Sequence, residues 1–181
     1  MRNMTELDMY LFGQSTHYDI YRKMGAHPMK TRKEEGTVFD VWAPHAEKVY
    51  VTGSFNGWSE TSHEMKRLEP KEMGIYELFI PGVKNGDMYK YLIETPDGKR
   101  LYKADPYATY AELRPGTASV VYDISHFKWT DQSWMETRAQ TDPYEKPMAI
   151  YEVHPGSWMR HPREEDEALY TYREFAKALT T

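Results

Sequence analysis

The chain has 181 residues, no cysteine and a formal net charge of −5 at pH 7. These values exclude a disulfide framework and a thiolate metal site. They also argue against nucleic acid as a partner, because phosphate binding needs clustered Lys and Arg. Aromatic residues make up 14 % of the chain, including 15 Tyr, so a ligand that packs on ring faces, such as a neutral sugar polymer, is compatible.

No stretch of the sequence has the length and apolarity of a membrane span or of a secretory signal. We therefore expect a cytoplasmic protein without a membrane partner.

Residues 1–30 are expected to form an N-terminal segment that is polar and aromatic. A short helix is predicted at Asp19–Met24, where Gly25 provides a stop signal.

Residues 31–126 follow the pattern of short strands separated by Gly, Pro and Asn. Alternating apolar and polar side chains are clearest at Ile75–Ile80 and Tyr89–Ile93. The predicted strands are Val38–Trp42, Lys48–Gly53, Gly74–Ile80, Met88–Thr95, Arg100–Lys103 and Ala118–Tyr122. This pattern predicts a mostly β fold, an Ig-like antiparallel β-sandwich.

Residues 127–147 are expected to be a linker, and residues 148–181 read as a strand followed by a helix. The strand is predicted at Met148–His154 and the helix at Glu167–Leu179. A (β/α)8 barrel needs eight such βα units, so the sequence predicts a truncated first unit of a barrel belonging to a larger enzyme. The apolar stripe of this helix should dock on the sandwich, self-associate with a second copy, or be poorly ordered.

We predict no catalytic residue in this chain. A glycoside-cleaving site needs two facing carboxylates, and no pair can be placed. Gly156-Ser157-Trp158 lacks the second glycine of a nucleophile elbow, and His154 and His161 have no third ligand at metal spacing. No cofactor or metal is therefore expected.

Binding is better supported by the residues than catalysis. Trp58 lies at the end of a strand and turn, where it is either a core side chain or an exposed platform. Lys90 lies between Tyr89 and Tyr91 on a predicted strand and is either solvated or bound to a ligand. Tyr102 is a further aromatic candidate, near Asp105.

Several motifs, in this order and spacing, resemble the N-terminal carbohydrate-binding module (family 48) of α-amylase-superfamily enzymes. They are Phe39–Pro44, Val51–Trp58, Gly74–Leu78, Tyr89–Tyr91, Ala104–Pro106 and Arg114–Ala118. Met24–Pro28 is similar to bacterial 1,4-α-glucan branching enzymes, and Ile150–His154 with Tyr172–Ala176 resembles the first strand and helix of their barrel.

The resemblance implies that the parent enzyme forms α-1,6 branches in glycogen by transferring α-1,4-glucan chains. Its catalytic carboxylates would lie on later barrel strands, so none is carried over to this chain. The implied partners are α-1,4-glucans, namely glycogen, starch and maltooligosaccharides.

The implied sugar-binding residues are Trp58, Lys90, Tyr102, Thr117 and Ser119. Trp58, Lys90 and Thr117 match the family's positions, Tyr102 is nearest to its second platform, and Ser119 replaces an Asn. Two alternatives are a docking domain that binds no sugar, and the same module from a debranching hydrolase.

Overall fold

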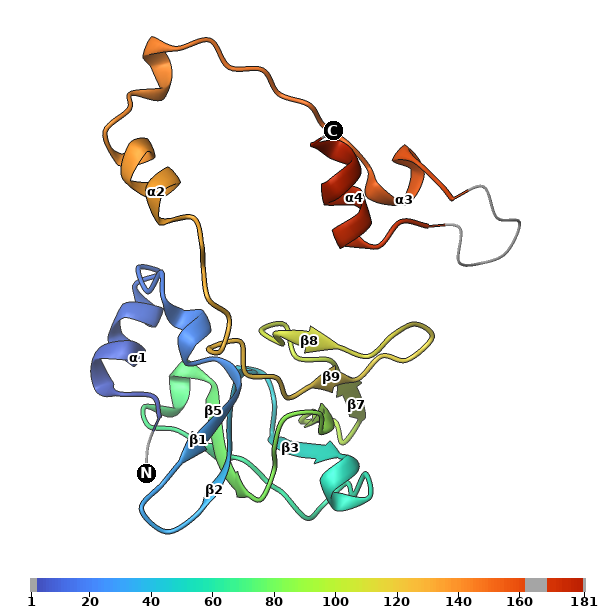
Figure 1. The fold of residues 1–181 in the computed structure, drawn as a ribbon. Coiled ribbons are helices and arrows are strands. Elements are labelled where there is room, and N and C mark those ends of the chain that lie inside the picture. The colour runs from blue at the N-terminus through green and yellow to red at the C-terminus, as the bar shows by residue number, and fades with distance from the viewer. Residues whose placement is uncertain (1–2, 162–168, 181) are drawn as a thin grey trace. The chain divides into compact units, whose positions relative to one another are not determined.

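The computed structural model describes residues 3–161 and 169–180 (Figure 1). The chain divides into two compact units, with the boundary between Lys128 and Trp129. Because the relative placement of the units is not determined, each is described by itself. None of the described helices is long and apolar enough to cross a membrane.

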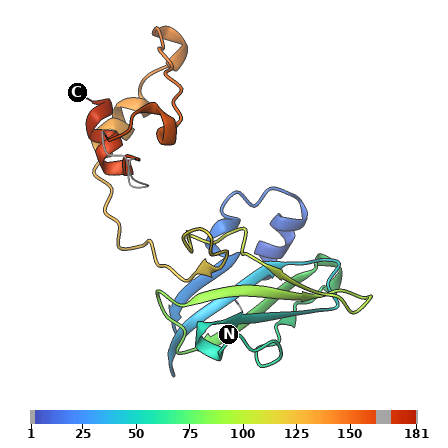
Figure 2. The same ribbon diagram turned by 90° about the vertical axis from the view of Figure 1, so that its right-hand side faces the viewer.

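The first unit contains two antiparallel sheets, which Figure 2 shows packed as layers. One sheet has the strand order β1 (Gly25–Lys30), β2 (Glu35–Trp42), β5 (Ile75–Pro81), β4 (Lys66–Arg67). The other has the order β3 (Lys48–Gly53), β6 (Met88–Glu94), β9 (Ser119–Val120), β8 (Tyr110–Ala111), and β7 (Arg100–Lys103) also pairs with β6. The predicted antiparallel β-sandwich is confirmed.

The core lies between the two sheets and is rich in aromatic residues. Successive side chains of a strand point to opposite faces, so Tyr89 and Tyr91 point inward and Lys90 points outward. Tyr89 meets Phe39 of the other sheet edge to face, with ring centroids 5.1 Å apart. The hydroxyls of Tyr89 and Tyr91 donate to the buried Asp105 at 2.6 and 3.2 Å. The two buried tyrosine hydroxyls and the Asp105 carboxyl are thereby hydrogen-bonded to one another.

The N-terminal segment packs on the sandwich through a second, methionine-rich cluster. Its buried members are Met4, Met9, Met24, Leu68 and Ile75. The segment contains α1 (Glu6–Gly13), which was not predicted and which begins with a capping box formed by Thr5 and Asp8. The helix predicted at Asp19–Met24 is a single 3-10 turn, Ile20–Arg22.

The described residues also form short 3-10 turns. Two lie between strands of the first unit, at Ser54–Asn56 and Lys71–Met73, and one lies in the second unit, at Pro143–Glu145.

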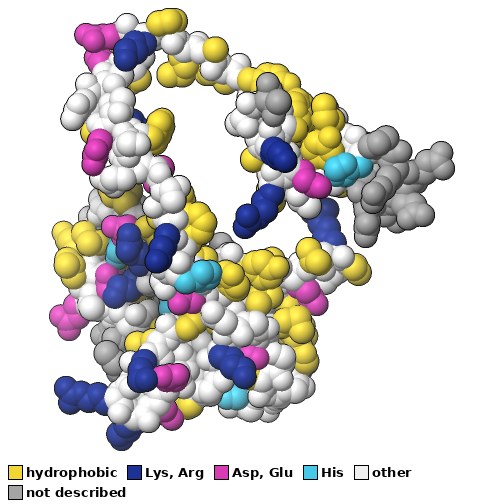
Figure 3. All heavy atoms as spheres, in the orientation of Figure 1, with side chains coloured by type: hydrophobic (Ala, Val, Ile, Leu, Met, Phe, Trp, Pro, Cys, Tyr) yellow, Lys and Arg dark blue, Asp and Glu magenta, His cyan; other side chains and the backbone are white. Residues whose placement is uncertain are grey.

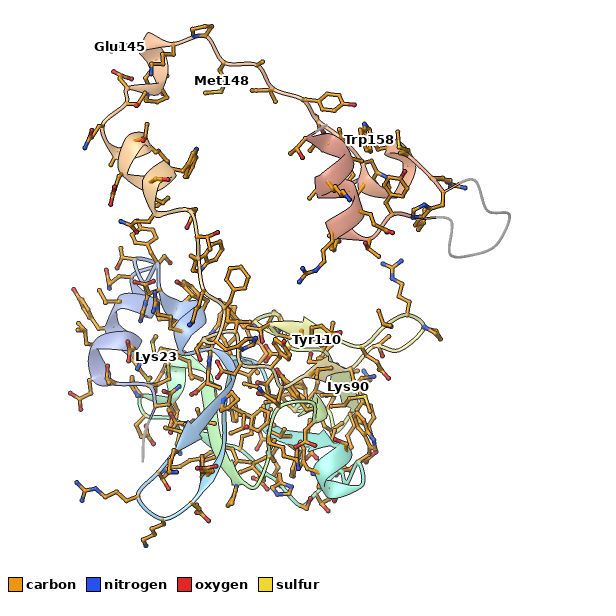
Figure 4. All side chains as sticks on the ribbon, viewed as in Figure 1. Lys23, Lys90, Tyr110, Glu145, Met148 and Trp158 are labelled. Carbon is orange, nitrogen blue, oxygen red and sulfur yellow. The ribbon has the colours of Figure 1, made fainter. Side chains whose placement is uncertain are left out.

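The second unit contains α2 (Gln132–Ala139), α3 (Pro155–Trp158) and α4 (Tyr172–Leu179). The Trp158 ring, labelled in Figure 4, contacts Phe175 of α4 edge to face at 5.1 Å. The Trp158 indole N–H donates to the Tyr151 hydroxyl at 2.7 Å. One apolar side chain of α4, Phe175, therefore packs on Trp158 of α3.

The strand predicted at Met148–His154 is absent from the described structure, where this segment is irregular and largely exposed. A parallel strand needs neighbours that satisfy its backbone groups and cover its faces, and the described part of this unit provides none. The helix is formed over Tyr172–Leu179, and its predicted start at Glu167 lies outside the described residues. The barrel unit stays a prediction.

Candidate ligand-binding site

A shallow, open cavity of about 470 Å³ lies on the outer face of the sheet that contains β6 and β7. It is lined by Trp58, Lys90, Tyr102, Glu112, Pro115, Gly116, Thr117 and Ala118. The structure thus brings together four of the five residues that were singled out for sugar binding. Figure 4 marks the position of Lys90.

Trp58 is presented by a tightly fixed turn after β3. Asn56 holds the turn, because its side-chain oxygen accepts from Gly53 N at 2.9 Å and its amide donates to Val51 O at 3.1 Å. Gly57 and Trp58 then adopt φ values of 61° and 60°. A residue with a Cβ in this left-handed region costs about 1–2 kcal/mol, so the surrounding turn must hold Trp58 in place.

The Trp58 side chain is 40 % exposed, which excludes its assignment as a core residue. Phe55 of the same turn is partly buried and packs against the core, with its ring centroid 6.2 Å from that of Phe39. The turn therefore directs one aromatic ring inward and another toward the cavity. An exposed indole held by a rigid turn is suited to stacking on a ligand.

Lys90 lies on β6, opposite Thr52 of β3. Its ammonium donates to the Thr117 hydroxyl at 2.6 Å. Thr117 belongs to the loop between β8 and β9, so this bond joins the loop to the central strand of the sheet. An ammonium has three donors, which leaves two for a ligand or water in the open cavity.

Tyr102 lies on β7 opposite Leu92, on the same outer face as Lys90. Its hydroxyl donates to Glu60, which also accepts from Arg100 at 2.8 Å. Hydrogen bonds from Tyr102 and Arg100 lower the pKa of Glu60, and the bond to Glu60 raises the pKa of Tyr102. The Tyr102 ring, 46 % exposed, is thus fixed by its hydroxyl and remains available to a ligand.

Ser119 is not brought to the cavity. It lies on β9 opposite Tyr89, faces the core and is 1 % exposed. Its hydroxyl accepts from the Asp105 backbone N–H at 2.8 Å. Ser119 therefore supports the strand below the site and makes no direct contact with a ligand in this arrangement.

Glu60 and Glu112 were missed by the sequence analysis. Glu112 accepts from Ala118 N at 3.0 Å and so braces the loop that carries Thr117. Glu60 lies far from Tyr102 in sequence, and no motif signalled their contact. A strand pattern does not specify which loop residue reaches a neighbouring strand.

The residues that line the cavity include one carboxylate. Among the described lining residues the only carboxylate is Glu112, and its side chain is bonded to the loop backbone. Glycoside cleavage requires two carboxyl groups on either side of the bond. The described residues also contain no group of three His, Cys, Asp or Glu placed to hold a metal ion.

Comparisons with known proteins show which proteins this chain is similar to. Residues 23–108 match the family model of carbohydrate-binding module 48 (isoamylase N-terminal domain). The chain is 56 % identical over 173 residues to the 1,4-alpha-glucan branching enzyme GlgB of Butyrivibrio fibrisolvens. This alignment covers 96 % of this chain and 27 % of that enzyme. It is 44 % identical to the enzyme of the same name from Synechococcus sp., covering 99 % of this chain and 25 % of the relative.

Among solved structures, type I pullulanase from Bacillus subtilis complexed with maltose matches with 31 % identity and a TM-score of 0.46. That match covers 59 % of this chain and 14 % of the pullulanase. The chain spans about a quarter of the length of the curated relatives it matches.

Proposed function

We propose that this chain binds α-1,4-glucan at the cavity beside Trp58. The match of residues 23–108 to the model of carbohydrate-binding module 48, and the similarity of the chain to part of 1,4-alpha-glucan branching enzymes, support this proposal. The observation that carries this proposal is the placement of two exposed rings, Trp58 and Tyr102, around the Lys90 ammonium in one cavity. The rings would pack on sugar C–H groups, and Lys90 would donate to sugar hydroxyls.

The expected affinity is weak. One ring face that covers roughly 100 Å² of sugar contributes at most about 2.5 kcal/mol of apolar transfer. Two faces and a few hydrogen bonds, after the cost of association, give a Kd of roughly millimolar to tens of micromolar. Such a site would keep a polymer close to the enzyme without holding a short sugar tightly.

In the whole enzyme, we propose that this module retains glucan while another part of the protein transfers α-1,4-linked chains to form α-1,6 branches. The chain described here would have no turnover of its own. The lack of paired carboxylates among the residues that line the cavity supports this division of roles. A cytoplasmic setting, where glycogen is made and cysteine-free chains are ordinary, belongs to the same proposal.

Affinity electrophoresis in a gel containing glycogen tests the binding proposal. Wild-type protein should be retarded, and Trp58→Ala should lower the retardation about tenfold. Trp42→Ala is the matched control, because Trp42 is also exposed (54 %) but lies on the other sheet. Equal migration of wild type with and without glycogen would overturn the proposal.

We further propose that α4 allows the chain to self-associate. Its exposed apolar side chains include Tyr172 and Leu179, which are 83 % and 44 % exposed. Burying them against a second copy would remove apolar surface from water.

A further inference from the structure

We infer that Tyr110 and Tyr122 form a second sugar platform, which extends the site around Trp58 and makes binding depend on glucan chain length. This inference rests on the proposed function, because it takes the same ligand class at a neighbouring position. Nothing in the motif analysis placed these two rings in a site.

The two tyrosines form a fixed and exposed pair. Their rings stack with centroids 5.3 Å apart and planes 29° apart. Tyr110 lies opposite Val120, so Tyr110 and Tyr122 are diagonal neighbours across β8 and β9, a spacing that aromatic side chains can bridge. His126 contacts the Tyr122 ring edge to face at 5.9 Å. Tyr110 and Tyr122 nevertheless remain 52 % and 38 % exposed.

The pair lies on the same face of the sheet as the Trp58 cavity. Val120 pairs with Met88 on one side and Tyr110 on the other, and Met88 and Lys90 share a face because they are two residues apart. Ser119 and Val121 are buried on the core face, so Tyr122 joins Val120 on the outer face. Figure 3 shows hydrophobic side chains gathered in the region of β8.

One hairpin connects the two places. The chain leaves Tyr110 along β8, forms the cavity wall with Glu112 and Thr117, and returns along β9 to Tyr122. Thr117 is three residues from Val120, the partner of Tyr110, which corresponds to roughly 10 Å at about 3.3 Å per residue. A ligand that touches both Trp58 and Tyr110 must also cross from β6 to β8, two strand spacings of about 4.8 Å each, so a longer glucan contacts both platforms more fully than a trisaccharide.

A sugar chain fits this surface better than another protein does. The pair is a small strip, while a stable protein interface buries roughly 800 Å² on each partner. Its rings are held by each other and by His126, so little side-chain freedom is lost when a sugar packs on them. The Thr109 hydroxyl donates to Tyr122 O at 2.7 Å and further fixes the hairpin at this end.

Titration calorimetry with maltotriose and maltoheptaose tests the inference on the full 181-residue chain. Wild type should bind maltoheptaose more tightly than maltotriose. Tyr110→Ala should weaken maltoheptaose binding five- to tenfold and change maltotriose binding less than twofold, and Tyr110→Phe should bind like wild type. Tyr18→Ala is the matched control, because Tyr18 is 88 % exposed in the N-terminal segment.

Three results would overturn the inference while leaving the proposed function in place. The first is equal affinity of wild type for the two sugars, and the second is unchanged maltoheptaose binding by Tyr110→Ala. A Tyr110→Ala variant that stays folded by circular dichroism but loses maltotriose would also contradict a separate platform. If wild type binds neither sugar, the proposed function itself fails.

Discussion

Trp58 shows how a single backbone conformation separates two roles within one turn. Because Gly57 and Trp58 both have positive φ, the chain reverses after Phe55, which packs against the core, and the indole remains outside. Among the described residues, Ser15 is the other non-glycine residue with positive φ. Strain of this kind is retained where surrounding structure enforces it, and here hydrogen bonds of Asn56 do so.

Asp40 is the residue whose ionisation should most affect stability. It lies on β2 directly opposite Glu77 and is 1 % exposed. Burial, together with the nearby Glu77 charge, raises the pKa of Asp40 to about 8, although the Asn3 amide donates to its carboxyl at 2.8 Å. In the unfolded chain an Asp titrates near 3.9.

We predict that Asp40→Asn stabilises the protein, increasingly so as the pH rises from about 4 to 8. Across this window the folded protein holds a proton that the unfolded chain has released, so the wild-type free energy of unfolding falls with increasing pH. The variant has no such ionisation and should gain up to about 5 kcal/mol at pH 8, because the shift spans roughly four pKa units at about 1.4 kcal/mol each. Urea denaturation at pH 5 and pH 8 measures the difference.

Asp19→Asn is a suitable control because Asp19 is exposed, with a side chain 67 % accessible. It should change the free energy of unfolding little at either pH. If the free energy of unfolding changes between pH 5 and pH 8 by the same amount in wild type and in Asp40→Asn, the buried carboxyl does not hold its proton as described.

At the scale of elements, the N-terminal segment acts as a cover for one sheet. The backbone N–H groups of Asn3 and Met4 donate to Glu77 at 2.7 and 3.0 Å, and Lys23 donates to Asn3 O at 3.0 Å. These contacts hold the methionine cluster against β5, on the sheet opposite the sugar site. Stability and glucan binding should therefore be separable.

We predict that Met24→Ala lowers the free energy of unfolding by about 2–4 kcal/mol, because Met24 is fully buried in that cluster. Glycogen retardation at a temperature well below the transition should remain within twofold of wild type. Thermal denaturation and gel retardation of the same sample provide both values. A large loss of retardation by the folded variant would contradict the separation.

Several strands could be predicted because alternation and turn residues mark them independently of their partners. Lys48–Gly53 and Arg100–Lys103 have the predicted bounds. β1 was missed because Pro28 weakens its strand pattern, yet a proline is tolerated on an edge strand such as this one. The strand predicted at Met148–His154 is not formed for the opposite reason, since its local pattern is suitable but the described residues of this unit supply no neighbouring strand.

The site could be predicted only in part, because contacts between distant segments of the chain leave no local sequence pattern. The resemblance placed Trp58, Lys90 and Thr117, and the structure joins them across β3, β6 and the β8–β9 loop. The partnership of Tyr102 with Glu60 depends on the path of a loop and had no local signal. Tyr110 and Tyr122 are twelve positions apart, and only the register of their strands makes them neighbours.

At the scale of the whole molecule, self-association through α4 is expected to depend on concentration. We predict that light scattering detects a rising average mass as the protein is concentrated, and that Tyr172→Glu restores a monomer by placing a charge in the contact. Tyr144→Glu is the control, since Tyr144 is 94 % exposed outside α4. A constant monomer mass for wild type would exclude this association.

The central claim is that this chain holds α-glucan through an exposed indole on its β-sandwich. Nuclear magnetic resonance of the indole N–H groups tests it directly, because the chain has 5 Trp and each gives a separate signal. On titration with maltoheptaose, the Trp58 signal should shift and saturate, while that of Trp42 stays in place. An unchanged Trp58 signal at saturating sugar would contradict the account.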